Sequence, residues 1–333
     1  MTVDWELILE NALTAAVGQN AVIYALAAIG LNIHFGYTGL LNFGQVAFVA
    51  CGAYGLAISV ATFELPFPVG IAIGLLAAVV LALLLGLPTL RLRADYLAIV
   101  TIAASEIIRF VLKSPEFDPT TGGSNGLQNF AGGFFDLNPF GPGEYGIWVV
   151  KFNERLTWVL LVGWALVALS SLLVFLLMRS PWGRVLKAIR EDEDAVRSLG
   201  KNVYSYKMQS LVLGGVIGAL GGFVFAIVNQ SVQPDNYSTA FTFFCYTALL
   251  LGGVARVAGP VVGAMLFWFL LQFTDVALRQ AISADYISES VLVGNEVGQV
   301  RLILVGLGLM LLMIFRPQGI FGDKREVAVS ARR

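Results

Sequence analysis

The sequence has few of the residues that soluble enzymes use for chemistry. It contains one histidine, His34, which argues against a histidine-based metal site or catalytic triad. Its two cysteines, Cys51 and Cys245, lie in apolar runs and form no CxxC metal pair or disulfide framework. Only 13% of the 333 residues are charged, against about a quarter in a soluble domain. The net charge of −1 also argues against binding to nucleic acid. These absences exclude an ordinary soluble enzyme, a disordered chain and a nucleic-acid binder.

Long uncharged runs make up much of the chain instead. The first, from Asn11 to Phe63, has no Asp, Glu, Lys or Arg. Because a helix needs about 20 apolar residues to cross a bilayer, we expect about nine membrane segments, with a range of eight to ten, and some broken or re-entrant helices. The expected fold is an all-α, polytopic membrane helical bundle that forms one transmembrane domain over 1–333. The segments are roughly 12–34, 39–62, 67–88, 94–113, 156–178, 208–229, 240–254, 257–276 and 299–316.

Positive charge is distributed unevenly between the predicted loops. Residues 1–10 carry acidic but no basic residues, unlike the start of a cleaved signal peptide. The 179–207 loop alone contains seven Lys and Arg residues. The positive-inside rule therefore predicts an outside N-terminus, an outer loop at 114–155, a cytoplasmic loop at 179–207 and a cytoplasmic tail at 317–333. Within the outer loop we expect a short helix near 146–153.

The 179–207 loop has the pattern of one amphipathic helix. Ser180-Pro181 is a favourable helix start, and Gly200 a favourable stop. Between Trp182 and Leu199, apolar residues recur on one face, and opposite charges such as Glu193 and Arg197 lie four apart. Such a helix can lie in the headgroup region or dock into a protein groove. The acidic cluster Glu191–Asp194 favours a protein groove, because an anionic leaflet repels it.

The loop stretches Arg179–Arg184 and Ala188–Glu193 resemble the coupling loop of LivM-type permease subunits of bacterial ABC importers for branched-chain amino acids. Asp194-Ala195-Val196 followed by Gly200 resembles a degenerate Glu-Ala-Ala-x3-Gly signature, which such permeases present to their ATPases. Further similar stretches are Gly30–Asn32 with Phe35–Gln45, Asp95–Thr101 with Glu106–Arg109, Thr121–Leu127 and Phe315–Gly322.

The resemblance implies a permease in the bacterial inner membrane that works with other chains. These are a second, LivH-like permease, two cytoplasmic ATPases that use ATP and Mg, and a solute-binding protein outside. This chain is expected to be no enzyme and to bind no cofactor or metal: its only Gly-Lys pair, Gly200-Lys201, has Ala195 where a phosphate loop has glycine. The ATPase-coupling residues implied by the resemblance are Arg184, Arg190, Glu191, Asp192, Glu193, Asp194, Ala195 and Gly200.

The solute and the transport class have alternatives. Related permeases for urea, short amides and other neutral amino acids look much alike, so the resemblance leaves the solute open. A self-contained secondary transporter is the alternative of another class. It would need ionisable coupling groups inside the membrane, for which few residues qualify.

Polar residues in the apolar segments are candidates for the translocation path. Glu106 and Arg109 lie three apart, so they can pair on one helix face. The pair either fixes the bundle or lines the passage. Polar residues at the predicted helix break, around 35–41, either line a path for a zwitterion or form only a turn. The full set of path candidates is Tyr37, Thr38, Asn42, Gln45, Glu106 and Arg109.

Small residues at helical spacing predict close helix packing. Gly214, Gly218 and Gly222 recur every four residues on one segment, and Gly259 and Gly263 do so on another. For His34 we expect a hydrogen-bonded structural role rather than proton transfer.

Overall fold

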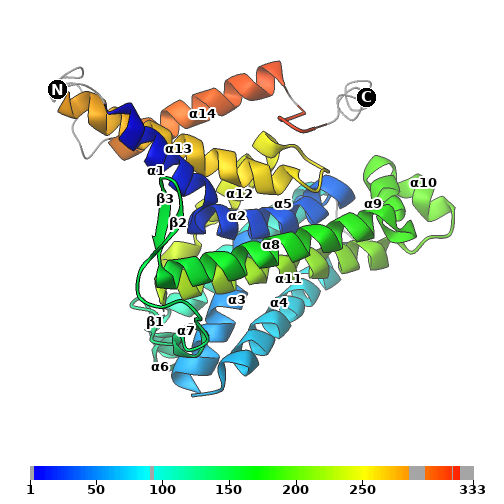
Figure 1. The fold of residues 1–333 in the computed structure, drawn as a ribbon. Helices are drawn as coiled ribbons and strands as arrows, with labels where there is room; N and C mark the ends of the chain where they lie inside the picture. The colour runs from blue at the N-terminus through cyan, green and yellow to red at the C-terminus, as the bar shows by residue number, and fades with distance from the viewer. Residues whose placement is uncertain (1–3, 91–93, 285–296, 317, 323–333) are drawn as a thin grey trace.

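The computed structural model describes residues 4–90, 94–284, 297–316 and 318–322, and its described part is a bundle of helices (Figure 1). The first half contains α1 (Trp5–Val17), α2 (Gln19–Leu31), the π-helical η1 (Asn32–Tyr37), α3 (Gln45–Ala57), the π-helical η2 (Ile58–Thr62), α4 (Phe67–Thr89), α5 (Ala94–Lys113), η3 (Pro115–Phe117), α6 (Asp118–Thr121), β1 (Leu127–Gln128), α7 (Gly132–Phe135), β2 (Glu144–Ile147) and β3 (Val150–Asn153). The second half contains α8 (Glu154–Arg179), α9 (Pro181–Glu191), α10 (Glu193–Ser198), α11 (Val203–Asn229), β4 (Ser231–Val232), η4 (Pro234–Tyr237), α12 (Thr239–Gly252), α13 (Gly259–Ser283) and α14 (Val297–Phe315).

The predicted polytopic helical bundle is confirmed. Helices occur at all nine predicted segments, and within the described residues seven spans are long and apolar enough to cross a membrane. The other two segments miss those criteria for different reasons. The α5 helix carries four charged residues, and α12 has only 14 residues. The first span, Trp5–Tyr37, begins earlier than the predicted 12–34 and comprises two helices that meet at Gly18.

The centre of the bundle is built from α2, α3 and α11. Every residue of α2 from Ala21 to Leu31 is buried, as expected for a helix that is apolar on all sides. The α11 helix packs along α2, α3 and α4. The core thus surrounds the end of α2, where the chain leaves the α-helical conformation.

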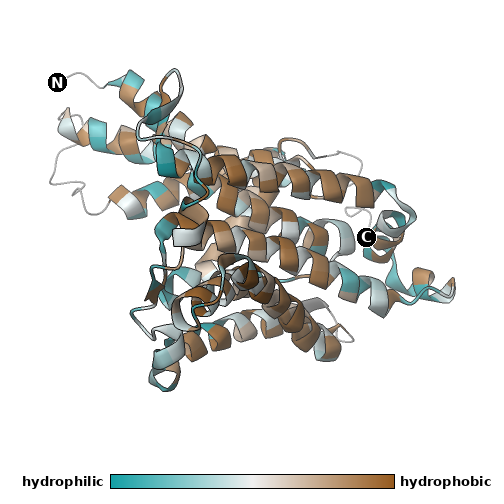
Figure 2. Ribbon diagram, turned by 60° about the horizontal axis from the view of Figure 1, so that its bottom comes forward, coloured by the Kyte–Doolittle hydropathy of each residue, from teal (hydrophilic) through white to brown (hydrophobic). Residues whose placement is uncertain are grey.

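The periphery of the bundle is apolar. Large exposed side chains such as Leu84, Leu169 and Ile314 lie on α4, α8 and α14. Figure 2 shows the long helices of the bundle predominantly in the hydrophobic colour, with hydrophilic residues gathered toward their ends. So much exposed apolar surface is typical of contact with lipid.

The 114–155 segment contains more than a connecting loop. The predicted short helix near 146–153 is wrong, because β2 and β3 form an antiparallel hairpin there. The turn places Trp148 at φ 57°, in the left-handed region, and leaves its side chain exposed. A second two-residue pair joins β1 to β4, antiparallel. These short strands tie the segment to itself and to the end of α11.

The single helix predicted from Trp182 to Leu199 is also wrong. Asp192 adopts an extended conformation (φ −153°, ψ 101°) and ends α9. Its side chain then accepts a hydrogen bond of 3.0 Å from the Ala195 amide and caps α10. Leu199, predicted on the apolar face, lies beyond this break and is 80% exposed.

The two connecting segments lie at opposite ends of the bundle. Figure 1 shows α9 and α10 at one end and the β2–β3 hairpin at the other. The predicted tail, 317–333, lies outside the described residues except for 318–322. That short stretch pairs with the end of α12 through Ile320 N to Leu251 O, at 3.0 Å, and Phe321 N to Gly252 O, at 3.1 Å.

Candidate functional site

A break in the membrane helices forms the centre of the candidate site. The α2 helix widens into η1, and the chain from Gly39 to Gly44 is irregular before α3 begins at Gln45. Gly39 has φ 76°. The Thr38 hydroxyl donates to Ile33 O at 2.8 Å, and Leu40 N donates to His34 O at 2.8 Å. Non-helical backbone at membrane depth requires such internal hydrogen bonds.

A buried amide and imidazole network holds the break. Asn42 Oδ1 accepts from Gly44 N at 2.9 Å, which fixes the orientation of its amide. Asn42 Nδ2 donates to His34 Nδ1 at 3.0 Å and to Gln45 Oε1 at 3.1 Å. His34 therefore carries its proton on Nε2 and donates it to Leu211 O at 3.1 Å. His34 has the hydrogen-bonded position expected of a structural residue.

The path candidates at the break all face the interior of the chain. Tyr37, Thr38, Asn42 and Gln45 are buried. Gln45 Nε2 donates to Ala27 O at 3.2 Å and to Gly214 O at 3.3 Å, so its amide ties α2 and α11 to α3. In this conformation these side chains stabilise the break, and their contact with a solute stays a prediction.

Asn32 connects the break to the turn between α12 and α13. Its Oδ1 accepts from Ala255 N at 2.9 Å and its Nδ2 donates to Arg256 O at 2.9 Å. Ser210 of α11 contacts the Thr38 hydroxyl at 2.7 Å. Sequence reasoning did not select Asn32 or Ser210. The available signal was a polar residue inside an otherwise apolar run.

The 179–207 loop contacts the break directly. Arg190 Nη1 of α9 donates to Gly36 O. Lys187 lies 5.8 Å from the centre of the Tyr37 ring. A Cβ atom added at Gly39 would lie 3.1 Å from Arg190 Cγ, so glycine permits this close approach. The structure thus brings together Arg190 and the break residues, which the sequence analysis placed in separate groups.

The predicted coupling residues divide into an outward and an inward set. Glu193 turns inward, where it pairs with Lys207 of α11 and, at 2.8 Å, with Arg197. Arg190 also points inward, toward the break. The remaining members are exposed: Arg184, Glu191, Asp192, Asp194, Ala195 and Gly200. The outward set forms the surface that a partner could reach.

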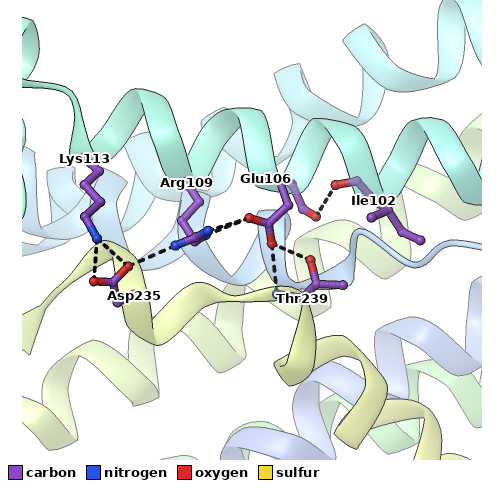
Figure 3. A network of polar contacts seen from close by, with 7 residues as sticks. Ile102, Glu106, Arg109, Lys113, Asp235 and Thr239 are labelled. Carbon is purple, nitrogen blue, oxygen red and sulfur yellow. Dashed lines mark hydrogen bonds and ion pairs between the residues drawn. The ribbon is translucent and has the colours of Figure 1, made fainter.

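A second polar cluster lies on α5 (Figure 3). The predicted pair is present, with Arg109 Nη2 2.8 Å from Glu106 Oε2. Arg109 also binds Asp235 of η4 at 2.9 Å, and the Thr239 hydroxyl donates to Glu106 Oε1 at 2.5 Å. Lys113 Nζ lies 2.7 Å from Asp235 Oδ2. The cluster therefore fastens α5 to the chain just before and at the start of α12, and a role in the passage stays a prediction.

Charge pairing affects Asp235, which lies outside the helical spans. Its carboxylate accepts from Lys113 and, more weakly, interacts with the Arg109 guanidinium. These contacts hold the pKa of Asp235 below its ordinary value. The Asp235 carboxylate, which tethers η4 to α5 through Lys113 and Arg109, is therefore ionised at neutral pH.

The glycine rows lie at close helix contacts. A Cβ atom added at Gly214 would meet the His34 ring, one at Gly218 the Gln45 amide at 2.5 Å, and one at Gly222 the Val49 carbonyl. Gly259 and Gly263 lie against the backbone of Gly253 and Ala248. Helix α11 thus lies close to the network around the break because the glycines on this face have no side chains.

Comparisons with known proteins agree with this architecture. The family model described as the branched-chain amino acid transport system permease component matches residues 14–314. The high-affinity branched-chain amino acid transport system permease protein LivM of Escherichia coli (strain K12) is 31% identical over 330 residues, covering 96% of this chain and 72% of the relative. A probable branched-chain amino acid transport permease protein LivM of Methanocaldococcus jannaschii is 25% identical, covering 91% of each chain.

A shorter match concerns a different solute. The autoinducer 2 import system permease protein LsrC of Escherichia coli O9:H4 (strain HS) is 29% identical over 147 residues, which is 42% of this chain and 43% of the relative. The family model and the LivM matches extend over nearly the whole chain, including the break, the 179–207 loop and the glycine rows. The chain therefore belongs to the family of branched-chain amino acid transport system permease components.

Proposed function

We propose that the chain is the permease subunit of an ATP-driven importer that carries a branched-chain or other neutral amino acid into the cytoplasm by alternating access. The observation that carries the proposal is the contact between the 179–207 loop and the helix break. Arg190 of the loop binds Gly36 O of the break directly, so a displacement of the loop would act on the break.

Coupling would proceed through α9. When ATPase partners move the exposed surface of the loop, Arg190 and Lys187 pull or release the break at Gly36 and Tyr37. The break in turn is tied to α11 through His34 and to the α12–α13 turn through Asn32. Displacement of α9 would therefore reach several membrane helices together, as alternating access requires.

The proposed partners are supported by the permease family to which the chain belongs. ATP hydrolysis would belong to two cytoplasmic ATPases that dock on the outward set of the loop. A second, LivH-like permease would complete the passage, and a solute-binding protein would deliver the solute to the outer side. In this arrangement the chain is not an enzyme, the N-terminus lies outside the inner membrane, and the 179–207 loop and the C-terminus lie inside.

The solute class rests on the relatives. The LivM proteins named for branched-chain amino acids align with nearly all of this chain, whereas the autoinducer 2 permease aligns with less than half. A neutral amino acid is therefore favoured over autoinducer 2. Ligand screening of the binding protein that purifies with the chain would identify the solute.

The coupling role can be tested by charge reversal on the outward set. Asp194 is 88% exposed and its carboxylate pairs with Arg197 at 3.1 Å, so Asp194→Lys alters the docking surface while leaving the inward contacts of Glu193 with Lys207 in place. We expect ATP-driven uptake to fall at least about tenfold, because reversing a charge at an interface weakens docking by several kcal/mol. Uptake and ATP hydrolysis would be measured in proteoliposomes that contain the chain with its co-purifying partners.

Glu144→Lys is the matched control, because Glu144 is exposed on the hairpin at the opposite end. It should leave the coupling of ATP hydrolysis to uptake intact. Normal coupled uptake by the Asp194 variant would contradict docking of the ATPases on the outward set. Uptake that needs no ATPase partner would contradict the importer itself and favour a secondary transporter.

A further inference from the structure

A partly enclosed cavity of about 250 Å³ lies between the 179–207 loop and the membrane helices. The break, α9 and α10 form one side of it. The end of α4, the start of α5 and the start of α11 form the other. Six separate parts of the chain thus meet around one space, at the end of the bundle where α9 and α10 lie. The volume suits a small molecule rather than a peptide or a nucleotide.

One part of the cavity wall carries charges of both signs. Lys207 reaches it from α11 with its side chain only 11% exposed, and it pairs with Glu193 of α10. Arg190 of α9 adds a second cation, with a side chain 22% exposed. A lysine ammonium has three donors and a carboxylate accepts several hydrogen bonds, so the Lys207–Glu193 pair can bind a further cation and a further anion together.

The rest of the wall combines aliphatic side chains with Thr38, Gly39 and Thr89. Leu40 of the break, Leu90 at the end of α4 and Leu97 of α5 form a small buried cluster, and Ile189 of α9 closes this side. An inorganic anion would leave this surface in contact with water. A purely apolar ligand would strip water from the charged groups without replacing their hydrogen bonds, which is costly.

We infer that the cavity binds an amino-acid zwitterion with an aliphatic side chain, and that the bound amino acid slows transport from the loop side. The carboxylate would lie toward Lys207 and Arg190, the ammonium toward Glu193, and the side chain among Leu40, Leu90 and Leu97. The regulatory part of this inference rests on the proposed function, because it assumes that the transported solute accumulates on the loop side.

Inhibition follows from the position of the ligand. A molecule that contacts α9 and α10 together with α4, α5 and α11 stabilises the arrangement in which these elements surround it. Transport requires α9 to move relative to them. A ligand that binds one arrangement more tightly therefore slows the cycle in proportion to its differential affinity.

The binding test uses the full chain in lipid nanodiscs without a binding protein, with radiolabelled leucine as the probe. Isocaproate, which lacks the ammonium group, and isopentylamine, which lacks the carboxylate, are the competitors. We expect each to compete at least about tenfold less well than leucine, because each can make only one of the two charge contacts that leucine makes. Absence of leucine binding, or equal competition by isocaproate, would overturn the zwitterion assignment.

Two pairs of variants assign the binding to this cavity. Leu97→Phe fills the aliphatic side, and Leu97→Met keeps nearly the same volume as its control. Lys207→Met removes the buried cation, and Lys201→Met removes an exposed one from the same loop. We expect the first member of each pair to weaken leucine binding at least about tenfold relative to its control. Equal binding within both pairs would place the leucine elsewhere and overturn the inference.

The regulatory test uses proteoliposomes of the complete importer, with ATP and increasing leucine in the lumen on the ATPase side. The initial rate of uptake should fall as luminal leucine rises, and Leu97→Phe should shift half-inhibition at least about tenfold above Leu97→Met, each relative to its own uninhibited rate. Uptake that is unaffected by luminal leucine would overturn the regulation while leaving the proposed function standing. Failure of all ATP-driven uptake would instead count against the proposed function. The nanodisc assay would still test whether the cavity binds leucine.

Discussion

At the scale of single residues, the contact between the loop and the break depends on a glycine. Gly39 and Gly200 both have φ 76°, but an added Cβ meets Arg190 only at Gly39 and nothing within 4 Å at Gly200. Alanine at either position costs about 1–3 kcal/mol of backbone strain. We expect Gly39→Ala to lower the unfolding temperature more than Gly200→Ala and to reduce coupled uptake as well. Equal loss of thermal stability and uptake in the two variants would mean that the Arg190 approach contributes nothing.

Asn32 supports a second prediction at this scale. Its amide satisfies one buried N–H and one carbonyl of the α12–α13 turn, at Ala255 and Arg256. Asn32→Leu is similar in size but leaves both groups unsatisfied, at about 1–3 kcal/mol each. We expect a clear fall in the unfolding temperature in detergent, whereas Asn236→Leu at an exposed position should have little effect. An unchanged unfolding temperature for Asn32→Leu would show that the turn is held by other contacts.

Residue patterns in the sequence predicted part of this site. His34 and Asn42 were visible as polar residues near a glycine-rich interruption, and the spacing of Glu106 and Arg109 predicted their ion pair. The partners in the network could not be predicted, because Ser210 and Arg256 lie some 170 to 220 positions further along the chain. Helix propensity and periodicity contain no information about which segments become neighbours at that separation.

At the scale of elements, the Asp235 tether between α5 and η4 should make the stability of the fold depend on pH. The contacts with Lys113 and Arg109 lower the folded-state pKa of Asp235, so the tether stabilises the fold fully above the unfolded value of about 3.9. This contribution is lost as the pH falls through the lower folded pKa. The wild type should therefore exceed Asp235→Asn in unfolding temperature at pH 7, and the difference should shrink below about pH 4.

Asp136→Asn is the control for this pH series, since Asp136 is exposed in the 114–155 segment. It should match the wild type throughout. A difference between wild type and Asp235→Asn that stays constant down to pH 3 would show that the tether does not act through the charge of Asp235.

The helical spans were predictable because twenty uncharged residues have few alternatives in a membrane, but the connecting elements were not. The apolar period through 182–199 is compatible with one helix or with two that meet at an angle. The cap that Asp192 provides for α10 decides between them. The segment 144–153 has no alternation strong enough to distinguish a hairpin from a helix, and its Trp148 turn in the left-handed region is unusual for a bulky residue. Local capping and turn geometry thus determine whether these segments form one helix, two helices or a hairpin, which the hydrophobic pattern alone does not.

At the scale of the whole molecule, the proposed orientation places two exposed residues on opposite sides of the membrane. Trp148 on the hairpin and Leu199 beyond α10 are 81% and 80% exposed, and they lie at opposite ends of the bundle (Figure 1). With Cys51 and Cys245 replaced by alanine, Trp148→Cys and Leu199→Cys each offer one reactive thiol of nearly equal exposure. A membrane-impermeant maleimide added to intact cells should label the Cys at 148 alone, and added to inverted membrane vesicles it should label the Cys at 199 alone. The equal exposure makes the two sites controls for each other, because a difference in labelling then reflects the side of the membrane.

Labelling of both sites from one side would contradict a bundle that spans the membrane between them. The reversed pattern would place the 179–207 loop outside, where cytoplasmic ATPases could not reach α9.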